Sequence, residues 1–189
     1  MPEIPKSLED FITNEKYIST KNPLFNLAVA NMRVSRALQR AVNNQSKAVS
    51  TIADQINSIS ELNSTVQSYT QNKTNADEPI SFGKTKAEAK VLLDRLKAAG
   101  VDMKILDPMY AEYADTSKTS VQITDNKISL ISSALNAKIE NLNTQTSKEN
   151  LSLQTLTNRY TQSGDQASTV LQKDSQSKST IISGIKGLS

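Results

Sequence analysis

The 189-residue sequence contains no cysteine, histidine or tryptophan, and only three phenylalanines and five tyrosines. Without cysteine there are no disulfides and no thiolate metal ligands, and without histidine the commonest metal ligand and general base is missing. We also recognise no pair of catalytic carboxylates, so we expect no enzyme, no catalytic residues, no metal and no cofactor. The shortage of aromatic residues favours a narrow seam of aliphatic side chains between helices over a wide globular core.

Long hydrophobic runs and blocks of one charge are missing as well. The 22 basic and 19 acidic residues are spread along the chain, so no polybasic segment indicates nucleic acid as a partner. No apolar run approaches the ~20 residues that span a bilayer. The start, MPEIPKSLED, lacks a basic segment followed by an apolar one, so we expect no cleaved secretory signal and export by another route.

The last third of the chain shows the clearest pattern, because apolar residues recur at three- and four-residue steps from Val121 to Leu188 without a proline. This spacing predicts one long helix over 121–189 with a single apolar stripe, which must pack against another helix or other copies. We assign the first part of the stripe to an intramolecular seam and the rest to self-assembly. The seam residues are Ile128, Ile131, Leu135, Ile139 and Leu142, and the self-assembly residues are Leu153, Leu156, Tyr160, Val170, Leu171, Ile181, Ile182, Ile185 and Leu188.

A first long helix is predicted over 23–70. Asn22 suits an N-cap and Pro23 the first helical position, and no glycine or proline follows before Thr70. A heptad fits this helix, with seam positions that include Leu27, Val34, Leu38, Ile52, Ile59, Leu62 and Val66. Its polar seam residues, such as Gln45, are either partly exposed at the edge of a loose pair or fix the register at some cost in stability.

The segment 71–120 is predicted to be a variable insert between the two long helices. Residues 71–79 are polar and typical of a loop, and a capping box at Thr85 and Glu88 starts a helix that ends at Gly100. We expect Val101 to Leu106 to be a short strand or extended piece, and Asp107-Pro108 to be a turn. Residues 1–22 form either a short helix or an arm that orders on assembly.

Two positions in the second helix predict irregularity. The polar interval Asn143 to Asn150 separates Leu142 from Leu153 by eleven residues, which we read as a four-residue insertion into the heptad, so that the helix bends or changes partner there. Gly164 weakens the helix by up to about 1 kcal/mol relative to alanine.

Together these signals predict an all-α fold. It is an elongated antiparallel two-helix coiled-coil hairpin with a small mixed helical insert, assembling into a helical filament or tip complex. Because residues 121–171 suffice to pair with the first helix, the last turns overhang. Their exposed aliphatic stripe is then a docking site for other copies.

The second helix also resembles known proteins. Leu153 to Tyr160 (LQTLTNRY), with Ser163, Ala167, Val170, Leu171 and the stretch STIIS at 179–183, resembles the C-terminal helix of type III secretion needle-tip proteins. The ending TIISGIKG at 180–187 is more similar to the EspA-like translocation filament proteins. The segment Thr85 to Leu96 is loosely similar to a helix of the tip proteins.

The resemblance implies an extracellular structural subunit, secreted to the bacterial surface by the type III apparatus without a cleaved signal. It would polymerise on the needle and form a hollow conduit through which effectors reach the host cell. The implied partners are other copies of the chain, the needle subunit, translocator proteins, a cytoplasmic chaperone before export, and unfolded effectors in transit. The alternatives are a needle-tip protein that caps the needle and an intracellular coiled-coil adaptor.

Overall fold

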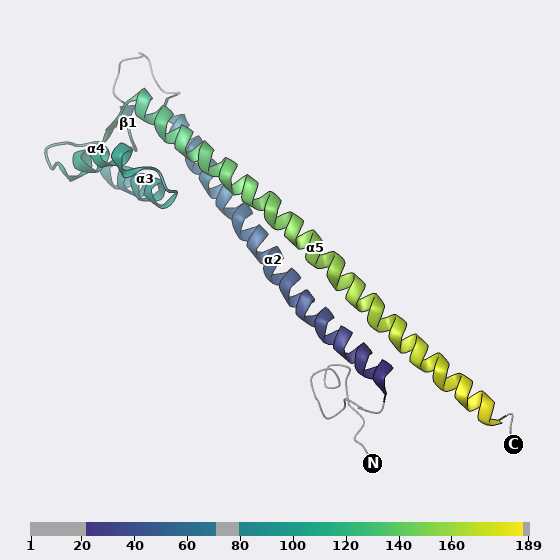
Figure 1. Ribbon diagram of the computed structural model, residues 1–189. Coiled ribbons are helices and arrows are strands. Elements are labelled where there is room, and N and C mark those ends of the chain that lie inside the picture. Colours follow the sequence, from purple (N-terminus) through teal and green to yellow (C-terminus); the bar gives the residue numbers. More distant parts are fainter. Residues whose placement is uncertain (1–21, 71–79, 187–189) are drawn as a thin grey trace. The chain divides into compact units, whose positions relative to one another are not determined.

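A computed structural model describes residues 22–70 and 80–186, with side chains described as far as Ser183. The arm predicted at the N-terminus and the loop predicted at 71–79 therefore lie outside the described residues, apart from Asn22. The described chain is mainly helical, as predicted, and its two long helices are in contact. The elements are α2 (Pro23–Ser68), β1 (Ile80–Ser81), α3 (Lys86–Ala98), α4 (Met103–Ala114), β2 (Gln122–Ile123) and α5 (Asp125–Lys186) (Figure 1).

Both long helices begin at side-chain caps. The amide of Phe25 donates to Asn22 Oδ1 at 3.1 Å, so Asn22 satisfies one of the free N–H groups at the start of α2. At the start of α5, the amide of Lys127 donates to Thr124 Oγ1 at 3.4 Å. The predicted start near residue 121 is thus four residues early, because Gln122 and Ile123 form β2 instead.

Helix α5 runs for 62 residues without a break, through both Gly164 and the polar interval 143–150. Its many serines and threonines have poor helix propensity, but their hydroxyls donate to the carbonyl four residues back and are satisfied inside the helix. The residues that do so are Thr144, Thr146, Ser147, Thr155, Thr157, Thr161, Thr169, Thr180 and Ser183. These bonds add little stability, so packing must hold the helix in place.

The chain divides into two compact units. The terminal unit combines residues 1–48 with 149–189, and the central unit comprises residues 49–148. Each long helix contributes to both units, so the insert predicted at 71–120 shares its unit with parts of α2 and α5.

In the central unit, α3 has the boundaries that its sequence predicts. Thr85 caps it by accepting from the amide of Glu88 at 3.2 Å, and Glu88 reaches back to accept from the amide of Lys84 at 2.8 Å. At the other end Gly100 adopts φ +88°, its amide donates to Lys97 and the amide of Val101 donates to Leu96. This pair of bonds is a Schellman motif, which closes the last turn of the helix.

Two expectations for the next segment are wrong. Val101 to Leu106 is no strand and Asp107-Pro108 is no turn, because α4 runs from Met103 to Ala114 with Pro108 inside it. A proline within a helix costs about 3 kcal/mol. Asp102 offsets part of this cost as an N-cap, because its side chain accepts from the amide of Lys104 at 2.9 Å. Leu106 and Met109 are both fully buried, and their burial offsets the rest at about 1.5 to 3 kcal/mol each.

The core of the central unit joins all of its elements. The antiparallel pair β1 and β2 places Ile80 opposite Ile123, and the rings of Tyr69 and Phe82 lie 5.4 Å apart. Its largest fully buried side chains are Val66, Phe82, Leu93, Leu96, Leu106, Met109, Val121, Ile123, Ile131 and Leu135. The insert is therefore a packed body and not a loop excursion.

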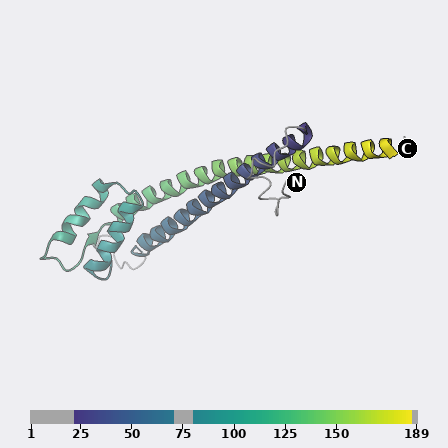
Figure 2. The same ribbon diagram turned by 90° about the horizontal axis from the view of Figure 1, so that it is seen from below.

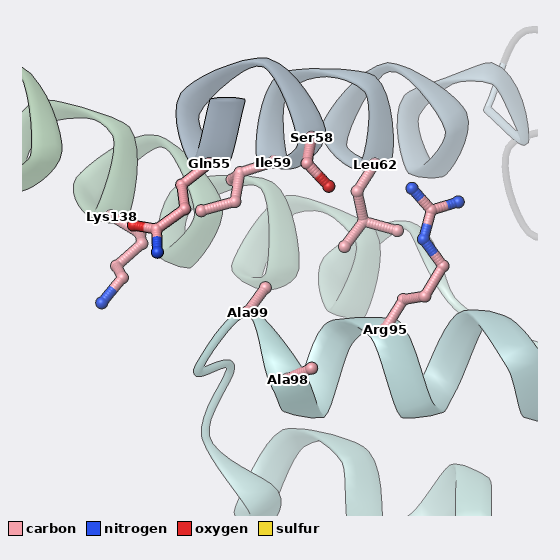
Figure 3. Close-up of a pocket in the computed structure, with 8 residues that line it drawn as sticks. All are labelled: Gln55, Ser58, Ile59, Leu62, Arg95, Ala98, Ala99 and Lys138. Atoms are coloured by element: carbon pink, nitrogen blue, oxygen red, sulfur yellow. The ribbon is translucent and has the colours of Figure 1, made fainter. Parts of the chain in front are cut away.

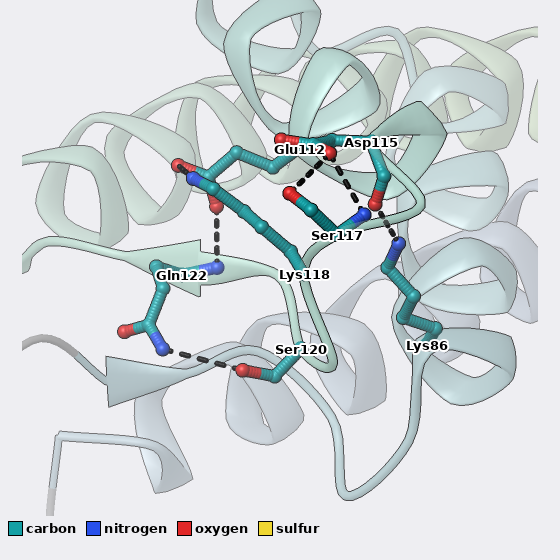
Figure 4. A network of polar contacts seen from close by, with 7 residues as sticks. All are labelled: Lys86, Glu112, Asp115, Ser117, Lys118, Ser120 and Gln122. Atoms are coloured by element: carbon teal, nitrogen blue, oxygen red, sulfur yellow. Dashed lines mark hydrogen bonds and ion pairs between the residues drawn. The ribbon is translucent and has the colours of Figure 1, made fainter.

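A network of polar contacts fixes the loop between α4 and β2 (Figure 4). Glu112 accepts from the amide of Gln122 at 2.7 Å and forms an ion pair with Lys118 at 3.3 Å. Asp115 accepts from both the amide and the hydroxyl of Ser117, which lowers the pKa of its carboxyl. Lys86 donates to the carbonyl of Asp115 and so ties the loop to α3.

Candidate interaction surfaces

Polar contacts across the two long helices set their direction and register. In the terminal unit, Asn22 donates to Asp174 at 2.9 Å, Ser163 donates to the carbonyl of Asn31 at 2.8 Å, and Gln45 donates to the carbonyl of Glu149 at 3.2 Å and to its carboxylate. In the central unit, Asn63 donates to Asn136 at 2.8 Å. In the terminal unit the partners on α5 come earlier in the chain as those on α2 come later, so the two helices are antiparallel there. In the central unit Figure 1 shows the end of α2 beside the start of α5, which is also an antiparallel arrangement.

One of the polar seam residues of α2, Gln45, has a defined partner on α5. Gln45 is half-buried, so it is partly exposed as one of the two interpretations predicts, and it also bonds to Glu149 across the seam. Such a layer fixes register, since a shift of either helix would leave a half-buried amide and carboxylate without partners. Sequence reasoning did not assign Asp174 or Ser163 to the seam, although both lie on the 3-4 spacing of the apolar stripe.

Of the two seam positions predicted for the heptad of α2, the structure confirms one and corrects the other. Leu38, Ile52, Ile59 and Val66 lie on the covered face, but Leu27 and Val34 are 49 % and 52 % exposed. The second seam position passes instead through residues one place later, which are Ala28, Ser35, Val42, Val49, Ile56 and Asn63. Leu62 is buried beside α3 in the central unit, among the residues that line a cavity there.

The predicted interruption of the α5 heptad is also wrong. Buried or half-buried residues follow one another at alternating steps of four and three, with Thr146 and Glu149 filling the seam between Leu142 and Leu153. The eleven-residue step from Leu142 to Leu153 consists of two four-residue steps and one three-residue step of an unbroken repeat, so it is not an insertion. The interval is polar because the seam itself is polar there.

The predicted stripe residues of α5 fall into three groups. Ile128, Ile131, Leu135 and Leu142 are buried and Ile139 is half-buried, all in the central unit. Leu153, Leu156, Tyr160, Val170 and Leu171, which were assigned to self-assembly, are half-buried, and most lie at the same steps as the residues bonded to α2. Ile181 and Ile182 are 62 % and 54 % exposed. The side chains of Ile185 and Leu188 lie outside the described residues.

Asp174 marks the point in the terminal unit where α2 stops covering α5. The residue is buried and bonds to Asn22, the cap of α2, and every described side chain after it is exposed. Lys178 at 2.6 Å, together with Asn22, holds the pKa of the Asp174 carboxyl below its usual range. Figures 1 and 2 show the end of α5, in yellow, continuing past the start of α2, in purple.

The central unit contains a cavity of about 330 Å³ between α2, α3 and α5 (Figure 3). Ile59, Leu62, Ala98 and Ala99 make its apolar wall, and Gln55, Ser58, Arg95 and Lys138 supply the polar groups. Arg95 and Lys138 lie toward opposite ends of the cavity.

The described part of the chain contains neither a cluster of metal-ligating residues nor a membrane-spanning helix. Across residues 22–70 and 80–186, no group of three or more acidic residues is placed to hold a metal ion. In the same residues, no helix is both long and apolar enough to cross a membrane.

Comparisons with known proteins give no family for this chain. No protein-family model matches it, and no curated protein or solved structure shows significant similarity.

Proposed function

We propose that this protein is a structural subunit that polymerises into the extracellular helical filament of a type III secretion system. In this function, copies of the chain stack on the needle and enclose a conduit for effectors in transit. The assignment to this system draws on the sequence resemblance of α5, and the proposed polymerisation draws on the structure of the terminal unit.

The observation that carries the proposal is the uncovered end of α5. Ile181 and Ile182 lie beyond Asp174, where the first helix no longer reaches, and more than half of each side chain is in water. Burying such a side chain is worth about 1.5 to 3 kcal/mol. Because each is already partly covered, a second copy that covers both would recover about 2 to 3.5 kcal/mol for each contact. Identical chains that each donate and accept such a contact form rings or filaments.

The test compares Ile182→Asp with the wild type by size-exclusion chromatography and negative-stain electron microscopy. Leu151→Asp is the matched control, because Leu151 is 65 % exposed on the same helix but lies off the stripe. We expect wild type and Leu151→Asp to form long polymers. Ile182→Asp should need at least about tenfold more protein to do so, since burying an unpaired charge costs more than 1.4 kcal/mol.

A wild type that stays monomeric at every concentration would contradict the proposal. So would Ile182→Asp polymers that form as readily as those of the control. Protein that is retained in the cytosol under secretion-inducing conditions would favour the intracellular adaptor instead.

A further inference from the structure

Helix α2 carries a second apolar row that α5 leaves uncovered in the terminal unit. Leu27 and Val34 are about half exposed, and Leu24 is 36 % exposed at the same end of the helix. Leu27 and Val34 follow steps of three and four residues with three alanines, which gives the outer row of α2: Leu27, Ala30, Val34, Ala37 and Ala41. The first four are exposed and Ala41 is half-buried. The row lies one residue before the positions that face α5, about 100° around the helix, and so forms a separate face.

The outer row adjoins the seam between α2 and α5. Leu38, which is half-buried in that seam, completes a hole with Val34, Ala37 and Ala41, because these four are spaced as the residues that receive one knob in a coiled coil. The alanines let a facing helix approach closely, and Val34 and Leu38 provide the rim. The hole is therefore shaped for one large aliphatic side chain at its centre.

The end of α5 presents side chains of this kind. The alternating steps that place Val170 and Asp174 against α2 next reach position 177 and then Ile181, with Ile182 beside it. Both isoleucines are exposed, so the heptad of α5 continues beyond the helix that covers it. This end needs a helix with an open apolar row, and the outer row of α2 meets that description.

The two surfaces of one copy cannot meet each other. Because the helices are antiparallel and Asn22 bonds to Asp174, each residue after Asp174 lies about 1.5 Å further beyond the start of α2. Ile181 could reach its own Val34 only if the continuous α5 helix broke. The geometry points to a second copy: we propose that the outer row of α2 receives the exposed end of α5 from another molecule of this chain.

This contact joins two different surfaces, so every copy donates one tail and accepts another. Such a heterologous contact propagates into a filament unless its rotation closes a ring. The inference rests on the proposed self-assembly and adds the receiving surface, which the uncovered tail alone does not identify.

The absence of cysteine from the chain allows a direct crosslinking test. Full-length Ala37→Cys and Ile182→Cys proteins are mixed, allowed to assemble and oxidised. We expect a disulfide-linked dimer of one chain of each kind, at least tenfold more abundant than dimers formed by either variant alone. Leu151→Cys mixed with Ile182→Cys is the control and should give no such dimer.

Each other outcome overturns the proposal. Efficient dimers of Ala37→Cys alone would mean that two outer rows face each other, and dimers of Ile182→Cys alone would mean that two tails do. A monomeric crosslink in a chain carrying both Phe11→Cys and Ala37→Cys would mean that residues 1–21 of the same chain occupy the row. Filaments that form without the Ala37 to Ile182 crosslink would leave the proposed function standing and exclude this contact, whereas a wild type that never assembles would remove both.

A second variant checks the same contact without oxidation. Val34→Glu places a carboxylate on the rim of the hole and should raise the concentration needed for assembly at least tenfold, while circular dichroism of the monomer stays unchanged. Ile182→Lys added to Val34→Glu should restore part of the loss by pairing the charges across the contact. A Val34→Glu protein that assembles as readily as the wild type contradicts the proposal.

Discussion

Gly83 is the position at which one added methyl group should damage the central unit most. Its φ of +90° belongs to a region that costs a residue with a side chain about 1 to 2 kcal/mol. A Cβ atom there would lie 2.8 Å from the backbone nitrogen of Ala89 and 3.2 Å from the carbonyl oxygen of Thr85. These are backbone atoms of the first turn of α3, so they cannot rotate away as a side chain would.

The expected cost of Gly83→Ala is therefore the sum of two effects. To the conformational cost we add about 1 to 3 kcal/mol for the shift that relieves the overlap, as for overpacked cores. The total is about 2 to 5 kcal/mol, which for a chain of this size lowers the thermal midpoint by roughly 4 to 20 °C. Gly83 is buried beside Phe82, so a displaced α3 would also disturb the core.

Two other glycines separate these contributions. Gly100 has φ +88° but open space around its Cβ position, so Gly100→Ala should cost only the conformational term of about 1 to 2 kcal/mol. Gly164 lies inside α5 with nothing within 4 Å, so Gly164→Ala should stabilise the chain by up to about 1 kcal/mol. Urea unfolding followed by circular dichroism gives the three values. If Gly83→Ala costs no more than Gly100→Ala, the contact with Ala89 is not as tight as the structure has it.

Two further predictions concern the seam between α2 and α5. The pKa of Asp174 is lowered by Lys178 and Asn22. Its charged form therefore stabilises the folded state above the usual aspartate pKa of about 3.9, and this contribution is lost as the pH falls through the pKa of Asp174 in the folded state. Unfolding midpoints below about pH 4 should therefore fall more steeply for the wild type than for Asp174→Asn, and parallel curves would refute this. In the polar layer, Gln45→Leu or Glu149→Leu alone should destabilise by about 1 kcal/mol because the other group loses its partner, whereas the double variant should match or exceed the wild type. A double variant that shows only the sum of the two losses would mean that the pair is not coupled.

The parts of the fold that the sequence predicts well are those fixed by local chemistry. Helix α3 begins and ends where it should because Thr85, Glu88 and Gly100 each satisfy a specific backbone group within a few residues. The start of α2 at Asn22 and Pro23 is predictable for the same reason. Helix α4 shows the limit of such rules, because burial of Leu106 and Met109 in the core outweighs the local preference of Asp107-Pro108 for a turn.

The seam could be predicted only in part, for a reason that lies in the sequence itself. On α2, apolar residues flank the row that contains Leu38 and Ile52 on both sides. The set on one side contains Leu27 and Val34, and the set on the other side contains Val42, Val49 and Ile56. Either choice makes a plausible heptad, and only contact with α5 decides between them. The same ambiguity leaves one apolar set uncovered, which is the physical origin of the outer row.

Burial is unevenly shared between the two units, and this bears on how the chain is stabilised. All of the largest fully buried side chains belong to the central unit, where α3, α4 and the strand pair close over the long helices. Among the described residues of the terminal unit, those that are buried are small or polar, namely Ala28, Val29, Ser163, Ala167 and Asp174. Small residues and polar layers fix which residues face each other, but they remove little apolar area from water. The terminal unit thus has a defined register and a weak core, while its large aliphatics Leu27, Val34, Ile181 and Ile182 remain exposed. A helix pair of this kind gains most of its remaining stability when a neighbouring molecule covers those side chains. Assembly of this chain would then also stabilise the helix pair of the terminal unit, because the same residues serve both.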